Sequence, residues 1–249
     1  MKAVMLAAGI GNRLSKDRPE PPKVLLRFAG KTLLERHIAN LKRCGVGELV
    51  IGVGYEADMI AAEVARLGAG GFVRTVHNPH FRDGSGITLA SIGAEFACGR
   101  DVLLMDGDVL YEPDILGRLV RTAHRNCFLL DRDFEPGDEP VKLCVRGGEL
   151  VDFHKKVQGQ FDLMGESVGF FRFAADVSRD ILQRCQYHIE KNERALWYEE
   201  SIRDVLLARP PGTFGYEDVT GLSWIEIDFP EDVKRAELEI LPQVEGVRV

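Results

Sequence analysis

The sequence predicts an α/β protein in which a doubly wound, mostly parallel sheet carries a β-rich insertion. Apolar runs alternate with helical segments of about 10–13 residues through the first half, which is typical of parallel βαβ units. From Cys127 onward the pattern changes to short apolar segments separated by turn residues. The chain has 249 residues, 45% of them hydrophobic, so it is long and apolar enough to bury a full core.

The first half alternates four predicted strands with four predicted helices. Continuous apolar runs predict buried strands at Lys2–Ala7, Glu48–Val53, Phe72–Val76 and Asp101–Met105. Helices are expected at Thr32–Arg43, Ala57–Leu67, Thr88–Cys98 and Ile115–His124. In the first helix Leu34, Ile38 and Leu41 share one face, and Thr32 with Glu35 forms a capping box. This half therefore predicts a sheet covered by helices.

The second half begins with short strands and ends in helices. Strands are predicted at Cys127–Leu130, Val141–Val145, Leu150–Phe153, Val168–Phe173, Phe214–Val219 and Trp224–Ile227. Turns are predicted at Pro136-Gly137 and Gly147-Gly148. Helices are predicted at Ala175–Tyr187, Tyr198–Ala208 and Pro230–Leu241. No repeat or linker interrupts the pattern, so a single domain over residues 1–249 is expected.

Charge and composition exclude several classes of protein. The formal net charge of -7 argues against a general nucleic-acid binder, which would carry a basic surplus. A membrane span is not expected, because no run of about 18 apolar residues occurs. The five cysteines contain no CxxC pair, so neither a zinc site nor a disulfide framework is indicated. The short N-terminal apolar run does not resemble a signal peptide, so a cytoplasmic location is expected.

A glycine-containing loop follows the first predicted strand and reads Leu6-Ala7-Ala8-Gly9-Ile10-Gly11-Asn12-Arg13-Leu14. Gly9 and Gly11 allow backbone N–H groups to approach an anion closely. Arg13 adds a guanidinium fork and Lys23 a mobile ammonium, which together suit a polyphosphate. A dinucleotide fingerprint would need glycine at Leu14, and a Walker loop would need GxxxxGK, so both are excluded.

This loop and the following Pro22-Lys23-Val24-Leu25-Leu26 segment resemble nucleotidyltransferases that join a nucleoside triphosphate to a phosphorylated small molecule. The resemblance implies a Rossmann-like fold whose loop, here Leu6, Ala7, Ala8, Gly9 and Gly11, wraps the triphosphate. It further implies that Arg13 and Lys23 bind the phosphates as catalytic residues. The expected halves are then a nucleotide-binding half, 1–126, and an acceptor-binding half, 127–243.

Two acidic segments predict a magnesium site. Asp106 and Asp108 flank Gly107 directly after an apolar strand, and ligands of open α/β sheets bind beyond the strand C-termini. Late in the chain, Glu226 and Asp228 stand two apart on a predicted strand and so share a face. Carboxylate oxygens suit Mg²⁺. The family resemblance implies that Asp108 and Asp228 are the catalytic metal ligands, and it leaves the roles of Asp106 and Glu226 open.

The segment from Asn78 to Leu89 bears on the nucleotide base. It places Asn78, Gly84 and Ser85 before a predicted helix, where an ordinary capping loop is the alternative interpretation. Sugar-phosphate members of the family usually carry Gln and Gly-Thr-Ala here. The present pattern looks more like cytidylyltransferases for phosphocholine, inositol phosphate and aminoethylphosphonate. That resemblance implies CTP as the nucleotide, with Asn78, Gly84 and Ser85 near the cytosine.

Candidate acceptor-binding residues lie in the second half. Lys155 falls where inositol-phosphate members also have Lys and is expected to meet the acceptor phosphate, and Glu166 is expected to face the same cleft. The run Trp197-Tyr198-Glu199-Glu200 resembles a segment of phosphocholine-type members. An aromatic ring beside carboxylates suits an amine, which places Tyr198, Glu199 and Glu200 in the acceptor site. Solvated charges and core packing are the alternative interpretations.

The resulting hypothesis is a magnesium-dependent transfer of CMP from CTP to a phosphorylated, phosphocholine-like small alcohol, with release of pyrophosphate. Inositol 1-phosphate and a phosphonate are alternative acceptors. A uridylyl- or thymidylyltransferase for a sugar 1-phosphate and guanylyl transfer to a molybdopterin are enzymatic alternatives. A nucleotide-binding regulatory protein is the non-enzymatic alternative. The sequence leaves a homodimer open, and it does not specify the pathway.

Overall fold

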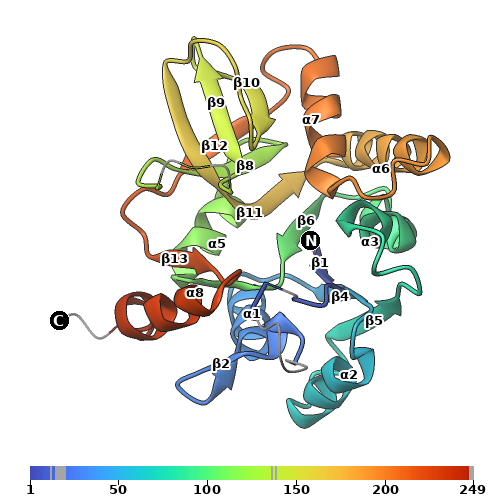
Figure 1. Ribbon diagram of the computed structural model, residues 1–249, viewed down its shortest axis with the longest axis vertical. Coiled ribbons are helices and arrows are strands. Elements are labelled where there is room, and N and C mark those ends of the chain that lie inside the picture. The colour runs from blue at the N-terminus through green and yellow to red at the C-terminus, as the bar shows by residue number, and fades with distance from the viewer. Residues whose placement is uncertain (12, 15–20, 136, 138, 247–249) are drawn as a thin grey trace.

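The computed structural model describes residues 1–11, 13–14, 21–135, 137 and 139–246. Strands of these residues form a nine-stranded sheet in the order β10-β9-β11-β6-β1-β4-β5, with β8 pairing β11 and β12 pairing β8 (Figure 1). The strands are β1 (Lys2–Ala7), β4 (Glu48–Val53), β5 (Val73–His77), β6 (Val102–Asp106), β8 (Cys127–Asp131), β9 (Lys142–Arg146), β10 (Glu149–His154), β11 (Leu163–Phe173) and β12 (Gly215–Asp218). This confirms a mixed α/β fold with a mostly parallel central sheet.

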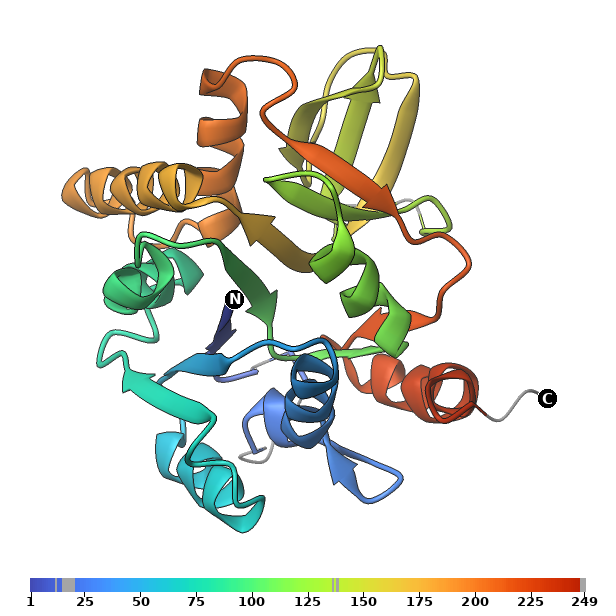
Figure 2. The same ribbon diagram turned by 180° about the vertical axis from the view of Figure 1, so that it is seen from behind.

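Helices cover both faces of the sheet. They are α1 (Leu33–Arg43), α2 (Ala57–Arg66), α3 (Ser85–Ser91), α4 (Gly93–Phe96), α5 (Pro113–Arg121), α6 (Ala175–Glu190) and α7 (Tyr198–Ala208). Neighbouring β1 side chains alternate between two cores, with Met5 packing towards α1, α2 and α5 and Val4 towards α3, α4, α6 and α7. Figure 2 shows α1 and α5 next to each other when the molecule is seen from behind. The fold is therefore doubly wound.

The parallel strands of the first half bring two chemistry-bearing loops together. Strand β1 pairs in parallel with both β4 and β6, and its register sets Leu6 opposite Asp106. The loop after β1 and the loop after β6 therefore leave the same edge of the sheet side by side. Strand β11 runs antiparallel to β6 and joins this part to the β-rich insertion, whose β9–β10 hairpin extends beyond the edge (Figure 1).

The C-terminal segment returns to the first half. Strand β13 (Trp224–Glu226) pairs antiparallel with β7 (Val109–Tyr111), directly after the β6 loop. The chain then forms α8 (Pro230–Arg235), the π-helix η2 (Ala236–Ile240) and α9 (Leu241–Val244), and Ile225, Ile227 and Ala236 pack into a small third core. The remaining elements are the 3-10 helix η1 (Lys23–Leu25) and the hairpin strands β2 (Arg27–Phe28) and β3 (Lys31–Thr32).

The predicted elements are confirmed in position, with some differences at their boundaries. The helix expected at Thr88–Cys98 starts earlier and divides into α3 and α4 around Ile92, next to Gly93, whose missing side chain leaves room for Leu182. The closing helix expected at Pro230–Leu241 becomes a π-helix after Arg235. Pro136 lies outside the described residues. Within the described part, no helix is both long and apolar enough to cross a bilayer.

Candidate active site

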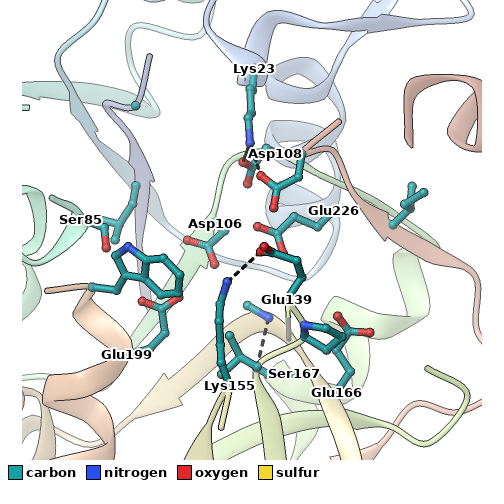
Figure 3. Close-up of a pocket in the computed structure, with 18 of the residues that line it drawn as sticks. Lys23, Ser85, Asp106, Asp108, Glu139, Lys155, Glu166, Ser167, Glu199 and Glu226 are labelled. Atoms are coloured by element: carbon teal, nitrogen blue, oxygen red, sulfur yellow. Dashed lines mark hydrogen bonds and ion pairs between the residues drawn. The ribbon is translucent and has the colours of Figure 1, made fainter. Parts of the chain in front are cut away.

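A cleft of about 1040 Å³ lies at the carboxyl edge of the sheet, between the two halves of the chain (Figure 3). Its walls come from the loop after β1, the end of β6, the β-rich insertion, the start of α7 and the segment after β13. The predicted residues that line it are Leu6, Ala8, Gly9, Arg13, Lys23, Gly84, Ser85, Asp108, Lys155, Glu166, Tyr198, Glu199 and Asp228. An adjoining smaller pocket adds Ala7 and Gly11.

A buried histidine contacts the backbone of the loop that follows β6. His37 on α1 is fully buried, and its Nε2 lies 3.2 Å from the carbonyl oxygen of Gly107. Burial lowers the pKa of His37 to about 4, so the ring is neutral near pH 7 and donates to that carbonyl. The bond fixes the turn between Asp106 and Asp108. The sequence pattern of α1 indicated only a core face, so this role was missed.

The late strand brings its acids to the same place. Asp108, Glu226 and Asp228 each offer one carboxylate oxygen that lies within 4.8 Å of the other two. This convergence results from the pairing of β13 with β7. The hydrogen bonding extends one step beyond the paired strands, because the N–H of Ile227 donates to the carbonyl of Asp108 at 3.0 Å. The carboxylate of Asp232 accepts from the N–H groups of Asp228 and its neighbour, at 2.9 and 2.7 Å, which fixes the backbone of Asp228.

Lys23 lies between two of these acids, as Figure 3 shows for Asp108. Its ammonium donates to Asp108 Oδ2 at 3.0 Å and to Asp228 Oδ1 at 2.6 Å. Burial favours the neutral amine, but the two adjacent carboxylates outweigh it and raise the pKa of Lys23. The desolvation of Asp228 is likewise outweighed by Lys23, so its pKa is lowered. Both groups are therefore charged near neutral pH.

The carboxylates fit a hard divalent cation. Three carboxylates that each offer an oxygen within 4.8 Å of the others, on a cleft wall, are the ligand type that a hard divalent cation takes. Desolvation, followed by the like charges of Asp108 and Asp228, raises the pKa of Glu226 well above its usual range. Such concentrated negative charge in one place favours the binding of a cation. Glu226, whose role the sequence left open, belongs to this group.

Arg13 and Lys155 are bridged by a residue that sequence reasoning missed. The exposed carboxylate of Glu139 accepts from Arg13 Nη1 and from Lys155 Nζ, both at 3.2 Å. Arg13 also bonds Asp228 Oδ2 at 3.0 Å. Figure 3 shows Lys155 and Glu139 meeting in the middle of the cleft. Glu139 lies in the loop between β8 and β9, where no local pattern distinguishes it from other surface acids.

The segment expected near the base packs against the start of α7. The hydroxyl of Ser85 accepts from the N–H of Tyr198 at 3.1 Å, and the phenol of Tyr198 donates to Asp106 Oδ2 at 2.7 Å. Gly84 has φ +144°, and a Cβ there would lie 2.6 Å from the carbonyl oxygen of Arg194. Asn78 is fully buried away from the cleft lining, and its amide donates to Thr88.

The aromatic and acidic residues at the start of α7 lie partly in the cleft and partly outside it. The ammonium of Lys155 lies 3.9 Å from the centre of the Trp197 ring, so this aromatic face already carries a cation. Glu199 lines the cleft, and its Oε2 is buried with no hydrogen-bond partner among the residues that the structure describes. Glu200 does not line the cleft and instead pairs with Nε2 of His154 at 2.9 Å. Tyr198 is almost fully buried.

Two of the carboxylates predicted to face the acceptor are strongly desolvated. Burial raises the pKa of Glu199 to about 7, and burial followed by the nearby charge of Asp131 raises that of Glu166 to about 7. Burial and the carboxylate of Glu199 also raise the pKa of Asp106 well above its usual range. The floor of the cleft is thus rich in acids that a bound cation would stabilise in the charged form.

The comparisons with known proteins agree with this architecture. A family model described as "MobA-like NTP transferase domain" matches residues 3–162. The chain is 27% identical to the CMP-5'-(3-aminopropyl)phosphonate synthase of Streptomyces rubellomurinus, covering 100% of this chain and 40% of that protein. It is 31% identical to the bifunctional IPC transferase and DIPP synthase of Rubrobacter xylanophilus, covering 96% and 52% respectively. The chain thus spans about half or less of the length of these two relatives.

Among solved structures, the inositol-1-phosphate CTP transferase from T. maritima is similar over 100% of this chain and 98% of its own. The TM-score is 0.75 and the sequence identity 21%. This likeness shows that the two proteins share a fold.

Proposed function

Because this chain belongs to the MobA-like NTP transferase domain family, we propose that it transfers CMP from CTP to a small amine that carries a phosphate or phosphonate group, releasing pyrophosphate. One relative is named for making a CMP-aminopropylphosphonate, and one similar solved structure is named as a CTP transferase. The observation that carries the acceptor assignment is a buried carboxylate oxygen of Glu199 on the cleft wall, which accepts no hydrogen bond from the described part of the chain. It offers a hydrogen-bond acceptor that a ligand ammonium satisfies.

In the proposed reaction an acceptor phosphate or phosphonate oxygen attacks the α-phosphorus of CTP in line. A new P–O bond forms while the bond from the α-phosphorus to the pyrophosphate oxygen breaks. The attacking oxygen is already anionic near pH 7, so no general base is needed. Catalysis then consists of positioning and charge neutralisation.

The cations of the cleft supply that neutralisation. Arg13 and Lys23 lie beside the loop after β1 and stabilise the charge that develops on pyrophosphate. Asp108, Glu226 and Asp228 would hold Mg²⁺, which when bound neutralises phosphate charge. Lys155, on the opposite side of the cleft, binds the acceptor phosphate or phosphonate. Positive charge thus approaches the reacting groups from two sides.

The acceptor ammonium is proposed to be primary rather than quaternary. A quaternary ammonium has no N–H and depends on aromatic faces, and Lys155 covers the face of Trp197. A primary ammonium donates three hydrogen bonds, which carboxylates such as Glu199 and Asp106 accept. The expected order of preference is therefore aminoethylphosphonate before phosphocholine, with inositol 1-phosphate last.

The test is competition among these three acceptors at equal concentration with CTP and Mg²⁺, with the CDP or CMP adducts measured by mass spectrometry. Glu199→Gln should reduce the preference for the primary amine at least tenfold. Glu200→Gln is the matched control, since Glu200 pairs with His154 outside the cleft lining, and it should retain that preference. Preference of the wild type for inositol 1-phosphate, unchanged in Glu199→Gln, would contradict the assignment.

A further inference from the structure

Lys142, the first residue of β9, is a lysine whose ammonium lies inside the protein. The residue is only 9% exposed. Its Nζ donates to the carbonyl oxygens of Gly137 at 2.7 Å, Pro140 at 3.3 Å and Lys155 at 2.7 Å. An ammonium has three protons, and three backbone carbonyls accept them. Burying a charge on carbonyls alone is costly, so this arrangement calls for an explanation beyond packing.

The three carbonyls belong to the two backbone segments whose side chains meet in the cleft. Gly137 and Pro140 flank Glu139, and the third carbonyl is that of Lys155 itself. On the cleft side, the carboxylate of Glu139 accepts from Lys155 at 3.2 Å. The two segments are therefore connected twice. Glu139 and Lys155 connect them on the side that faces the cleft, and the Lys142 ammonium connects them on the side away from it. Strand pairing adds to this, because Lys142 lies opposite His154 of β10, the residue before Lys155.

Lys142 itself is not among the residues that line the cleft, whereas Glu139, Pro140 and Lys155 are. It has no carboxylate within salt-bridge distance in the described part of the chain; its cross-strand neighbour Glu166 is the nearest acid by register. Its ammonium thus binds only backbone carbonyls in the described part of the chain, and these belong to the two segments that carry Glu139 and Lys155. The nucleotide side, with Arg13 and Lys23, is built on other elements.

We propose that Lys142 is a positioning residue for the acceptor, which it serves by fixing the backbone of Lys155 against the carbonyls of Gly137 and Pro140. The proposal rests on the proposed function, in which Lys155 binds the acceptor phosphate or phosphonate. Removing the ammonium leaves three carbonyls without a donor and releases the Lys155 backbone. Acceptor binding weakens, while CTP binding, which uses the opposite wall, is retained.

The experiment compares steady-state kinetics of Lys142→Met, which keeps an unbranched side chain but removes the ammonium, with those of Lys142→Arg and Lys156→Met. Lys142→Met should raise KM for the acceptor at least tenfold and leave KM for CTP within about twofold. Lys142→Arg, which retains several donors, should restore the acceptor KM to within about threefold of wild type. Lys156→Met removes the exposed neighbouring lysine and should change neither constant.

A double-mutant cycle with Lys155→Met separates positioning from general destabilisation. In the Lys155→Met background, Lys142→Met should add less than twofold to the acceptor KM, because its effect acts through Lys155. If Lys142→Met does not fold, Lys142→Gln takes its place in the cycle. Additive effects, an unchanged acceptor KM, or equal rises in both KM values would overturn the proposal. Absence of any nucleotidyl product from wild type would instead overturn the proposed function.

Discussion

At the residue scale, the proposed activity depends on the convergence of Asp108 and Asp228, which are 120 positions apart in the sequence. Asp108→Asn and Asp228→Asn each keep the shape of the side chain and remove the charge. Turnover should fall about 10²–10³-fold, by analogy with the loss of one transition-state donor. The melting temperature should fall only slightly, because each substitution weakens an ion pair with Lys23 but also relieves repulsion from Glu226. Pyrophosphate release measures the first effect and calorimetry the second. Activity within tenfold of wild type would contradict the role assigned, and exposed Glu231→Gln is the control.

The phosphate loop gives a second prediction at this scale. Gly11 has φ +71°, and a Cβ there would lie 3.4 Å from the side chain of Lys23. Gly11→Val is therefore strained and crowds Lys23, and CTP affinity should fall at least tenfold. Arg13→Lys should also weaken CTP binding, since a point charge does not replace a guanidinium fork. Calorimetric titration with CTP measures both, with exposed Arg43→Lys as the control. Wild-type affinity in both variants would exclude this loop as the triphosphate site.

At the scale of elements, Gly84 allows the start of α7 to dock on the segment before α3. Gly84→Ala places a methyl group 2.6 Å from the carbonyl of Arg194, at a φ of +144° that side chains rarely adopt. The variant should lose about 1–3 kcal/mol of unfolding free energy. It should also raise the acceptor KM, because the backbone that the methyl group displaces leads into Glu199. Chemical denaturation measures the first quantity. Gly70→Ala, with open space around it, should be neutral. Equal stability of the two variants would contradict this docking.

A buried glutamate connects the first two helices. Glu63 on α2 accepts from the N-cap hydroxyl of Thr32 at 2.8 Å and from Arg66 Nε at 2.6 Å. The Arg66 bonds outweigh desolvation and lower the pKa of Glu63 to about 2. Between about pH 4.5 and 2 the unfolded chain therefore binds more protons than the native protein, so stability falls as the pH falls through this range.

Glu63→Gln should make the acid limb of the unfolding curve shallower and cost about 2 kcal/mol at pH 7, as expected for hydrogen bonds to a charged group. Urea denaturation at several pH values between 2.5 and 7 measures both effects. The exposed Glu237→Gln should follow the wild-type curve. If Glu63→Gln retained the wild-type pH slope, the low pKa of Glu63 would be excluded as its cause.

Much of this architecture could be predicted from the sequence because it is encoded locally. The apolar runs of β1, β4 and β6 and the capping residue Thr32 of α1 each act within a few positions. Boundaries were less predictable where tertiary packing decides them, as at Gly93 against Leu182. The site follows the same division. Glycine spacing, Arg13 and the paired acids could be recognised, but Glu139, His37 and Lys142 act through contacts with distant segments, which no local pattern encodes.

At the scale of the whole molecule, the cleft joins both halves of the chain, so ligands should stabilise the protein as a unit. Binding at 100 times Kd contributes about 2.7 kcal/mol, which for a domain of this size raises Tm by about 5–10 °C. Thermal unfolding with CTP and Mg²⁺ should show this rise, and ATP at the same concentration should give a smaller one. An equal rise with ATP would contradict selection of the cytosine base.

The proposed activity is measured directly by pyrophosphate release from ATP, CTP, GTP and UTP, each with Mg²⁺ and a panel of phosphoalcohols and phosphonates. Release is expected with CTP in the presence of aminoethylphosphonate, at least tenfold faster than with the other triphosphates, and no release is expected without an acceptor. Release with GTP or UTP in preference to CTP, or none with any combination, would contradict the proposed activity.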